Sequence, residues 1–170
     1  PPRFPWTEKR LAELARHADV FISPFPKLPI WKCHCPTIIT VHDVLYLTHE
    51  SYRRRTRGFY DRWRLVNALR RSDLTWFVSR SSRMETVKLV GFDGNCPKVR
   101  HSGIDAVFDS RPDSRDRDVL AGLDLHPGYI VVMGNGKPHK NLGIILKCSE
   151  RLEREIVFAG VPEENRVYWR

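Results

Sequence analysis

The chain lacks long hydrophobic runs. No window of its 170 residues holds the roughly 20 apolar residues that a transmembrane helix needs. The first residues include neither an initiator methionine nor the apolar segment of a signal peptide, so we expect a piece of a longer protein. Internal repeats of fixed period and low-complexity tracts are also missing. The length is sufficient to bury a globular core.

Cysteine is scarce as well. The four cysteines, Cys33, Cys35, Cys96 and Cys148, are too few and too scattered for a disulfide scaffold, and they favour a reducing, cytoplasmic compartment. Cys33-His34-Cys35 has neither the spacing of about two to four residues nor the second ligand pair that structural zinc sites use. We therefore expect no metal ion, and no cofactor.

Acidic residues are outnumbered. The chain has 20 Asp and Glu against 29 Lys and Arg, a formal net charge of +9 and a pI near 9.7. Such an excess points to an anionic partner, whether a phosphorylated ligand, an anionic membrane surface or nucleic acid. Because no recognised nucleic-acid motif is visible, we expect no nucleic-acid partner.

The positive charge is concentrated in residues 50–71, where eight arginines accompany two acidic residues. Apolar residues at helical spacing predict a helix over 56–71, and the four that we expect to face inward are Phe59, Trp63, Val66 and Leu69. The arginines beside them are either a solvated helix face or a contact for anionic head groups at the inner face of a membrane. The arginines expected to contact such a membrane are Arg53, Arg54, Arg55 and Arg57.

One stretch stands out as a buried strand that ends in titratable side chains. Residues 37–41 are β-branched with no polar alternation, which is typical of a central strand in a parallel sheet covered on both faces. His42 and Asp43 follow directly, at the carboxyl end where such sheets bind ligands. Since neighbouring residues of a strand point to opposite faces, His42 and Asp43 are two candidate catalytic residues rather than one dyad.

The remaining pattern predicts an α/β protein. A Ser-x-x-Glu capping box at Ser82 opens one helix, and a second helix covers 142–152. Further strands are expected at 19–23, 74–78, 98–101, 129–133 and 155–159. A polar segment at 111–118 is the best boundary candidate, and we divide the chain into residues 1–122 and a first βαβ unit at 123–170.

The loop between the last two strands could hold phosphate. Residues 134–141 join a strand to a helix, where backbone N–H groups and the positive end of the helix point to one place. The candidate phosphate-binding residues are Gly134, Asn135, Gly136, Lys137 and Lys140. The sequence fits neither a full Gly-x-Gly-x-x-Gly nor a P-loop, so a tight turn with solvated lysines is the alternative.

Four short motifs occur along the chain in an order that is typical of one protein family. They are Thr40-Val41-His42-Asp43, the strand end Val78-Ser79 with Ser82, the turn His101-Ser102-Gly103-Ile104-Asp105, and Met133-Gly134 followed by Pro138-His139-Lys140-Asn141. This set resembles the group 1 (family 4) retaining glycosyltransferases of the GT-B fold, over about residues 19–160. The finer resemblance is to bacterial members that build cell-surface polysaccharide or lipopolysaccharide.

The resemblance implies two Rossmann-like domains with parallel sheets and flanking helices, both incomplete here. Residues 1–122 would be the end of the acceptor-side domain, and residues 123–170 the start of the domain that binds a nucleotide-sugar. His42 would bind the transferred sugar or organise the transition state. Lys140 would hold the donor diphosphate, and Gly134 would let the backbone approach it. Transfer would retain the anomeric configuration, with electrostatics in place of a metal ion.

This chain departs from the family pattern in two places. Asn135 stands where arginine often follows the glycine of the phosphate loop, and Ser102 replaces the usual asparagine of the turn. We expect the piece alone to be inactive. The alternatives are a nucleotide-sugar epimerase of the same architecture and a non-catalytic module that binds a membrane surface or a partner. The expected partners are a nucleotide-sugar donor and a saccharide or lipid-linked acceptor. The acceptor is an alternative to the membrane as the contact of Arg53, Arg54, Arg55 and Arg57.

Overall fold

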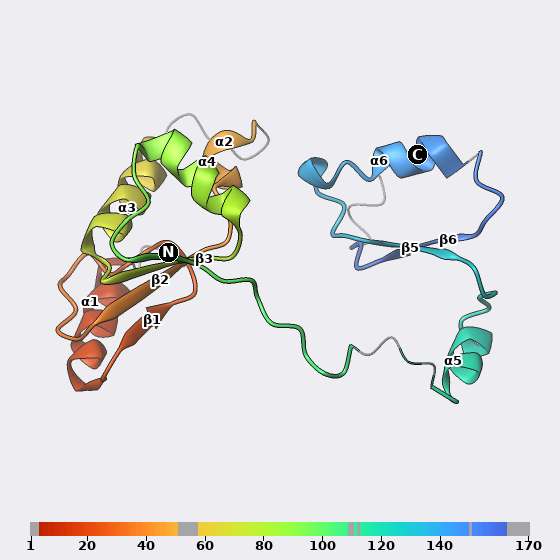
Figure 1. Cartoon of the computed structure of the whole chain (residues 1–170), viewed down its shortest axis with the longest axis horizontal. Coiled ribbons are helices and arrows are strands. Elements are labelled where there is room, and N and C mark those ends of the chain that lie inside the picture. Colours follow the sequence, from red (N-terminus) through yellow and green to blue (C-terminus); the bar gives the residue numbers. More distant parts are fainter. Residues whose placement is uncertain (1–3, 51–57, 109–110, 112, 150, 163–170) are drawn as a thin grey trace. The chain divides into compact units, whose positions relative to one another are not determined.

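The computed structural model describes residues 4–50, 58–108, 111, 113–149 and 151–162. The chain forms two compact units, residues 1–104 and 105–170 (Figure 1). Residues 105–122, which the sequence interpretation grouped with the first part, therefore cluster with the second. Both units contain parallel strands and helices, so the predicted α/β class with parallel sheets and flanking helices is confirmed.

The first unit is a four-stranded parallel sheet in the order β1-β2-β3-β4. The strands are β1 (Phe21–Ser23), β2 (Thr37–Val41), β3 (Leu74–Phe77) and β4 (Pro97–Val99). The helices are α1 (Phe4–Leu14) with a 3-10 turn at Ala15–His17, α2 (Leu45–Thr48), α3 (Gly58–Arg71) and α4 (Arg80–Val90). Each strand predicted for this unit is found: β2 has the predicted bounds, β1 starts two residues later, β3 ends one residue earlier, and β4 starts one residue earlier and ends two residues earlier.

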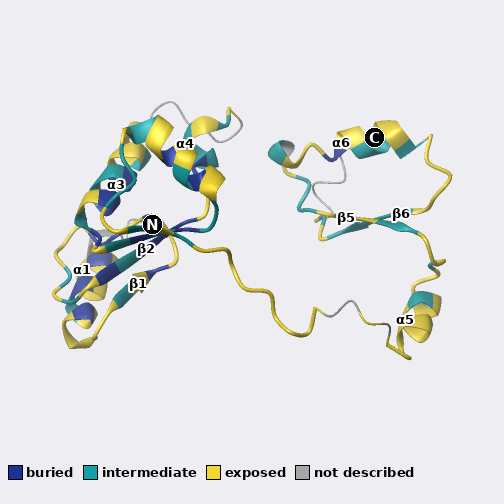
Figure 2. Cartoon of the chain, viewed as in Figure 1, coloured by how far each residue is buried: buried dark blue, intermediate teal, exposed yellow. Residues whose placement is uncertain are grey.

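The core lies on one face of this sheet. The register pairs Val41 of β2 with Phe77 of β3, and both side chains are fully buried. They pack with Leu65 and Leu69 of α3 in one cluster. Residues of the opposite sheet face are less covered, since Ile22 is 57% exposed. Most of the buried residues belong to this unit (Figure 2).

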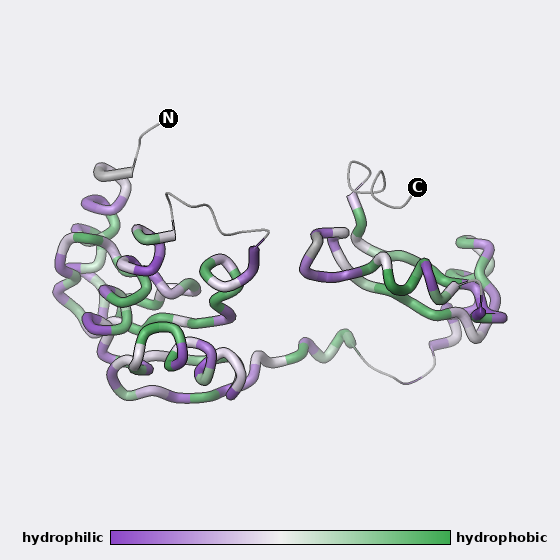
Figure 3. The backbone as a smooth tube through the Cα atoms, turned by 90° about the horizontal axis from the view of Figure 1, so that it is seen from above, coloured by the Kyte–Doolittle hydropathy of each residue, from purple (hydrophilic) through white to green (hydrophobic). Residues whose placement is uncertain are grey.

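The buried face of α3 differs from the prediction. Leu69 is buried, but Phe59 is 84% exposed and Trp63 45% exposed. The inward residues are instead Arg64, Leu65, Ala68 and Leu69. Spacing alone selected the wrong stripe because the true one contains an arginine that is neutralised by a partner on another helix. Figure 3 shows how hydrophilic and hydrophobic residues alternate along the helices.

The start of α4 also differs from the prediction. Ser79, in extended conformation two residues after the end of β3, is the N-cap, and its hydroxyl accepts a hydrogen bond from the Ser82 backbone N–H at 3.0 Å. The Ser82 hydroxyl in turn accepts from the Ser79 N–H at 3.2 Å, so the capping box is Ser79–Ser82 rather than Ser82–Glu85. The helix ends at Gly91, whose φ of +85° is a left-handed conformation that favours glycine.

The second unit pairs β5 (Ile130–Met133) with β6 (Ile156–Ala159) in parallel. Its helices are α5 (Asp116–Gly122), a 3-10 turn at Pro138–Lys140 and α6 (Gly143–Ser149). Among its described residues only Leu142 is buried. The predicted strand-loop-helix-strand pattern is present, and its hydrophobic core is small.

A buried ion pair joins α1 to α3 in the first unit. Arg64 Nη1 donates to Glu8 Oε1 at 2.6 Å and to Oε2 at 2.9 Å, and both side chains are less than a tenth exposed. Glu8 Oε2 also accepts from the backbone N–H of Ile30 at 2.9 Å. The pair therefore fixes two helices and the β1–β2 connection at one point.

We expect Glu8→Ala to lower the free energy of unfolding by about 3 kcal/mol, because it leaves a buried guanidinium without its carboxylate. Glu13→Ala on the same helix is the control. Its pair with Arg10 is exposed and 3.7 Å long, so the loss should stay below about 1 kcal/mol. Urea unfolding followed by circular dichroism measures both. Equal losses in the two variants would contradict the role of the buried pair.

Candidate functional site

The carboxyl ends of four parallel strands meet at one edge of the first sheet. The residues that follow them are Pro24 after β1, His42 after β2, Val78 after β3 and Arg100 after β4. This edge is the usual place for a ligand in an open parallel sheet. The parallel register thus places the predicted His42 and Asp43 beside loops from both neighbouring strands.

His42 is exposed and oriented by the main chain. Its Nε2 lies 3.1 Å from the carbonyl oxygen of Pro24, the residue that follows the neighbouring strand β1. A carbonyl oxygen only accepts hydrogen bonds, so Nε2 carries the hydrogen in this contact. In the neutral ring Nδ1 is then the nitrogen that can accept a hydrogen bond from a substrate hydroxyl.

Asp43 has a structural contact. Its Oδ1 accepts a hydrogen bond from the Leu45 backbone N–H at 3.0 Å, at the start of α2. The side chain is exposed, and among the described residues no hydrogen bond joins it to His42. Its second oxygen is available for a ligand, while the first serves the turn.

Tyr46 was not predicted from the sequence. Its hydroxyl is buried and, within the described part of the chain, makes no hydrogen bond. Burial raises the pKa of the phenol well above its usual range, and the Asp61 and Asp43 carboxylates raise it further. The Tyr46 ring therefore remains neutral next to the edge that carries His42. No local sequence pattern distinguishes this tyrosine from the others.

The predicted phosphate loop lies in the second unit and is turned tightly. Gly136 has a φ of +71° and Asn141 a φ of +46°. The Asn135 side-chain oxygen accepts from the Lys137 N–H at 3.3 Å, and the Gly134 N–H donates to Ala159 across the sheet at 3.0 Å. Lys137 and Lys140 are both exposed. The loop thus presents two ammonium groups at the carboxyl end of β5.

Most of the described arginines near α3 serve the fold. Arg64 pairs with Glu8, and Arg70 lies 5.6 Å from the centre of the Phe92 ring. Arg71 donates to the carbonyl oxygens of three consecutive residues, Pro29, Ile30 and Trp31, at 2.7 to 3.1 Å. The four arginines predicted to contact a membrane or an acceptor, Arg53, Arg54, Arg55 and Arg57, lie outside the described residues.

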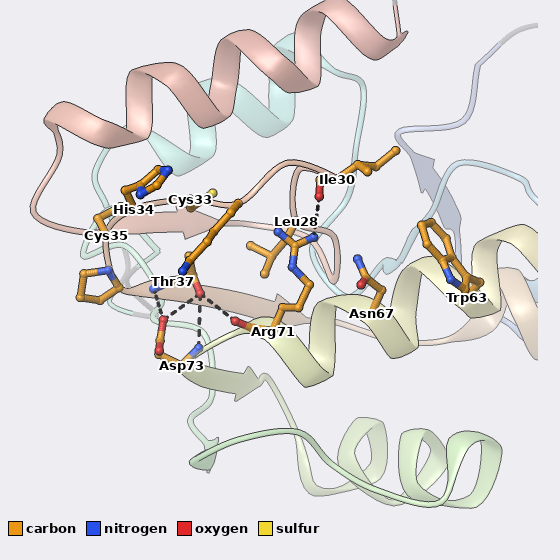
Figure 4. Close-up of a pocket in the computed structure, with 12 residues that line it drawn as sticks. Leu28, Ile30, Cys33, His34, Cys35, Thr37, Trp63, Asn67, Arg71 and Asp73 are labelled. Carbon is orange, nitrogen blue, oxygen red and sulfur yellow. Dashed lines mark hydrogen bonds between the residues drawn. The ribbon is translucent and has the colours of Figure 1, made fainter.

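A cavity of about 770 Å³ lies at the opposite end of the sheet from His42 (Figure 4). It is bounded by α3 on one side and by the β1–β2 connection on the other. Arg71 clamps this connection, and Asp73 Oδ2 fixes the start of β2 by accepting from the Thr37 N–H at 2.7 Å and its hydroxyl at 3.0 Å. The cavity is formed by segments distant in sequence, and periodicity does not reveal it.

The Cys33-His34-Cys35 segment lines this cavity. All four cysteines are free thiols, and burial raises the pKa of Cys33, as does the neighbouring Cys35. Across the residues that the structure describes, no group of three or more His, Cys, Asp and Glu side chains is placed to hold a metal ion. Nor does any described helix have the length and apolar character required to cross a membrane.

The raised pKa of Tyr46 predicts a loss of stability at alkaline pH. The unfolded chain releases this proton near pH 10 whereas the folded chain keeps it, so the free energy of unfolding falls as pH rises above about 10. Tyr46→Phe should reduce this slope by about 1.4 kcal/mol per pH unit. Urea unfolding between about pH 8 and 12 measures it. Identical slopes in the two proteins would contradict a buried phenol.

A comparison with known protein families gives a match over the first unit. The model of Glycosyltransferase Family 4 matches residues 1–108, which include the whole first unit and the edge with His42 and Asp43. A comparison with curated proteins found no match. Since the matched residues make up more than half of the chain, the protein belongs to Glycosyltransferase Family 4.

Proposed function

We propose that the protein transfers a sugar from a nucleotide-sugar donor to a saccharide or lipid-linked acceptor with retention at the anomeric carbon. The pathway we infer is cell-surface polysaccharide or lipopolysaccharide synthesis, with the protein in the cytoplasm. The observation that carries the proposal is an exposed histidine at the ligand edge of a family 4 domain, oriented by the Pro24 carbonyl.

His42 is proposed to act on the transferred sugar. With the hydrogen on Nε2 held by Pro24, Nδ1 accepts a hydrogen bond from a hydroxyl of that sugar and fixes its orientation. Asp43 lies next to it with one oxygen engaged by the backbone, so it is placed to bind an acceptor hydroxyl with the other. In this proposal His42 binds the transferred sugar and Asp43 binds the acceptor.

The loop 134–141 is proposed to hold the donor diphosphate. Lys137 and Lys140 supply two positive charges, and the left-handed Gly136 lets the backbone turn closely around an anion. When the bond from the anomeric carbon to the diphosphate breaks, its electron pair leaves with the diphosphate. The ammonium groups stabilise that charge, which is the part a metal ion plays in other transferases. The acceptor oxygen then bonds to the anomeric carbon, and the proton of its hydroxyl passes to the departing diphosphate.

Two variants test these assignments. His42→Ala should lower the transfer rate by about 100-fold or more, while His17→Ala, an exposed histidine on the 3-10 turn after α1, should leave it unchanged.

Lys140→Gln should weaken binding of nucleoside diphosphates by about tenfold, and Lys147→Gln on α6 is its control. The donor is identified first, by the rise in Tm that each of a panel of nucleotide-sugars causes when it is titrated into the protein.

Full activity of His42→Ala together with unchanged diphosphate binding by Lys140→Gln would reject the assignments. Product that forms without any acceptor would instead indicate the nucleotide-sugar epimerase.

A second candidate function is a module that binds the inner face of a membrane. One observation favours it: Phe59 is 84% exposed on the first turn of α3, with Trp63 stacked on Tyr60 one turn later. Exposed aromatic rings beside Arg62 suit the interface between lipid head groups and hydrocarbon. Arg53, Arg54, Arg55 and Arg57 belong to the same proposal.

Vesicle sedimentation separates this candidate from the transferase. Phe59→Ser should reduce binding to vesicles with phosphatidylglycerol by about tenfold, since one aromatic ring is lost from the interface. Phe108→Ser, an exposed phenylalanine elsewhere, is the control. Binding should also fade as salt is raised. Equal sedimentation of the two variants would exclude a membrane contact through α3.

A further inference from the structure

A groove of about 870 Å³ runs between α4 and β4 in the first unit. It is separate from the cavity beside Arg71, and none of the assignments above uses it. Its apolar residues are Met84 and Val87 on α4 with Pro97 and Val99 on β4. Met84 is 71% exposed and Val87 38% exposed, so an apolar floor lies open to solvent.

The rim of the groove is strongly positive. Five cationic side chains line it, Arg80, Arg83, Lys88, Lys98 and Arg100, together with one carboxylate, Asp93. That carboxylate is already neutralised, because Arg83 donates to it from Nε at 2.8 Å and from Nη2 at 2.6 Å. Within the described residues none of the other four cations pairs with a carboxylate. The groove therefore has an unbalanced charge of about four.

Floor and rim together select a class of ligand. A small inorganic anion would leave Met84 and Val87 uncovered, and a neutral hydrocarbon would leave the cations without a counter-charge. Among the described residues that line the groove, none has an aromatic side chain on which a nucleobase could stack. A molecule that carries both an anionic head and a hydrocarbon chain satisfies floor and rim at once.

The orientation of the ligand follows from the strands. Arg80 is the first residue of α4 and Arg100 follows β4, so both lie at the edge that carries His42. Lys88 lies about 12 Å further along α4, at a rise of about 1.5 Å per residue. A phosphate head between Arg80 and Arg100 would be at the edge where sugar is transferred, with the chain along Met84 and Val87.

We propose that this groove binds the phosphate head and the first methylenes of a lipid-linked acceptor. The inference rests on the proposed transferase function and names the acceptor class: an alkyl phosphate or diphosphate. Lys88 at the far end covers the chain with its own methylenes while its ammonium group stays in water. Arg80 and Arg100 are the binding residues for the head.

The test is calorimetric titration of the full chain with decyl phosphate below its micelle concentration. Decyl maltoside supplies the same chain without charge, and inorganic phosphate supplies charge without a chain. Decyl phosphate should bind at least about tenfold more tightly than either. Shortening the chain to octyl phosphate should weaken binding by about tenfold or more, as two buried methylenes are lost.

Matched variants locate the site. Arg100→Gln should weaken decyl phosphate binding by about fivefold, and Met84→Gln by a similar factor. Arg151→Gln and Met133→Gln, exposed residues of the second unit, should have no effect. Because Met84 is exposed on a helix, its replacement leaves the fold intact, which the thermal unfolding curve checks.

Three results would overturn the proposal: equal binding of inorganic phosphate, equal binding of decyl maltoside, or association only with phosphatidylglycerol vesicles and not with monomeric decyl phosphate. The last would assign the groove to bilayer lipid instead of an acceptor. Nucleoside diphosphate titrations on the same samples keep the two questions apart. If decyl phosphate binds but Lys140→Gln leaves the diphosphate unaffected, the groove stands and the donor site fails.

Discussion

The site depends on one constraint: four neighbouring strands run in the same direction. The main-chain ladder brings the residues after β1, β2, β3 and β4 to a single edge, although they are spread over some eighty positions of sequence. His42 finds its carbonyl partner only because β1 ends beside β2. The same alignment places Arg80 and Arg100 at that edge. A slip in register would separate all of them.

Elements of the fold that are determined by their own residues could be predicted from the sequence. The stiff run at residues 37–41 predicted β2, and the motif order predicted a family 4 glycosyltransferase domain, which the family match confirms. Strands were found near their predicted places because branched side chains disfavour other conformations. The parallel pairing of β5 with β6 also followed from the strand-helix-strand pattern.

Features that depend on contacts between residues far apart in the chain could not be predicted from the sequence. Arg64 is buried because Glu8, 56 positions earlier, neutralises it, and no local pattern along α3 reveals such a partner. The N-cap of α4 fell to Ser79 because the extended end of β3 brings that hydroxyl to the first free N–H groups. The buried hydroxyl of Tyr46 and the groove beside α4 likewise arise from contacts between elements.

The contact between His42 and Pro24 determines which changes in the loop after β1 can disturb the orientation of the histidine ring. Its partner is a main-chain oxygen, which every amino acid possesses, so no replacement at position 24 can delete the acceptor itself. Only a displacement of the peptide could do so. The ring orientation is thereby protected against point substitution in the adjoining loop, yet sensitive to an insertion or deletion there.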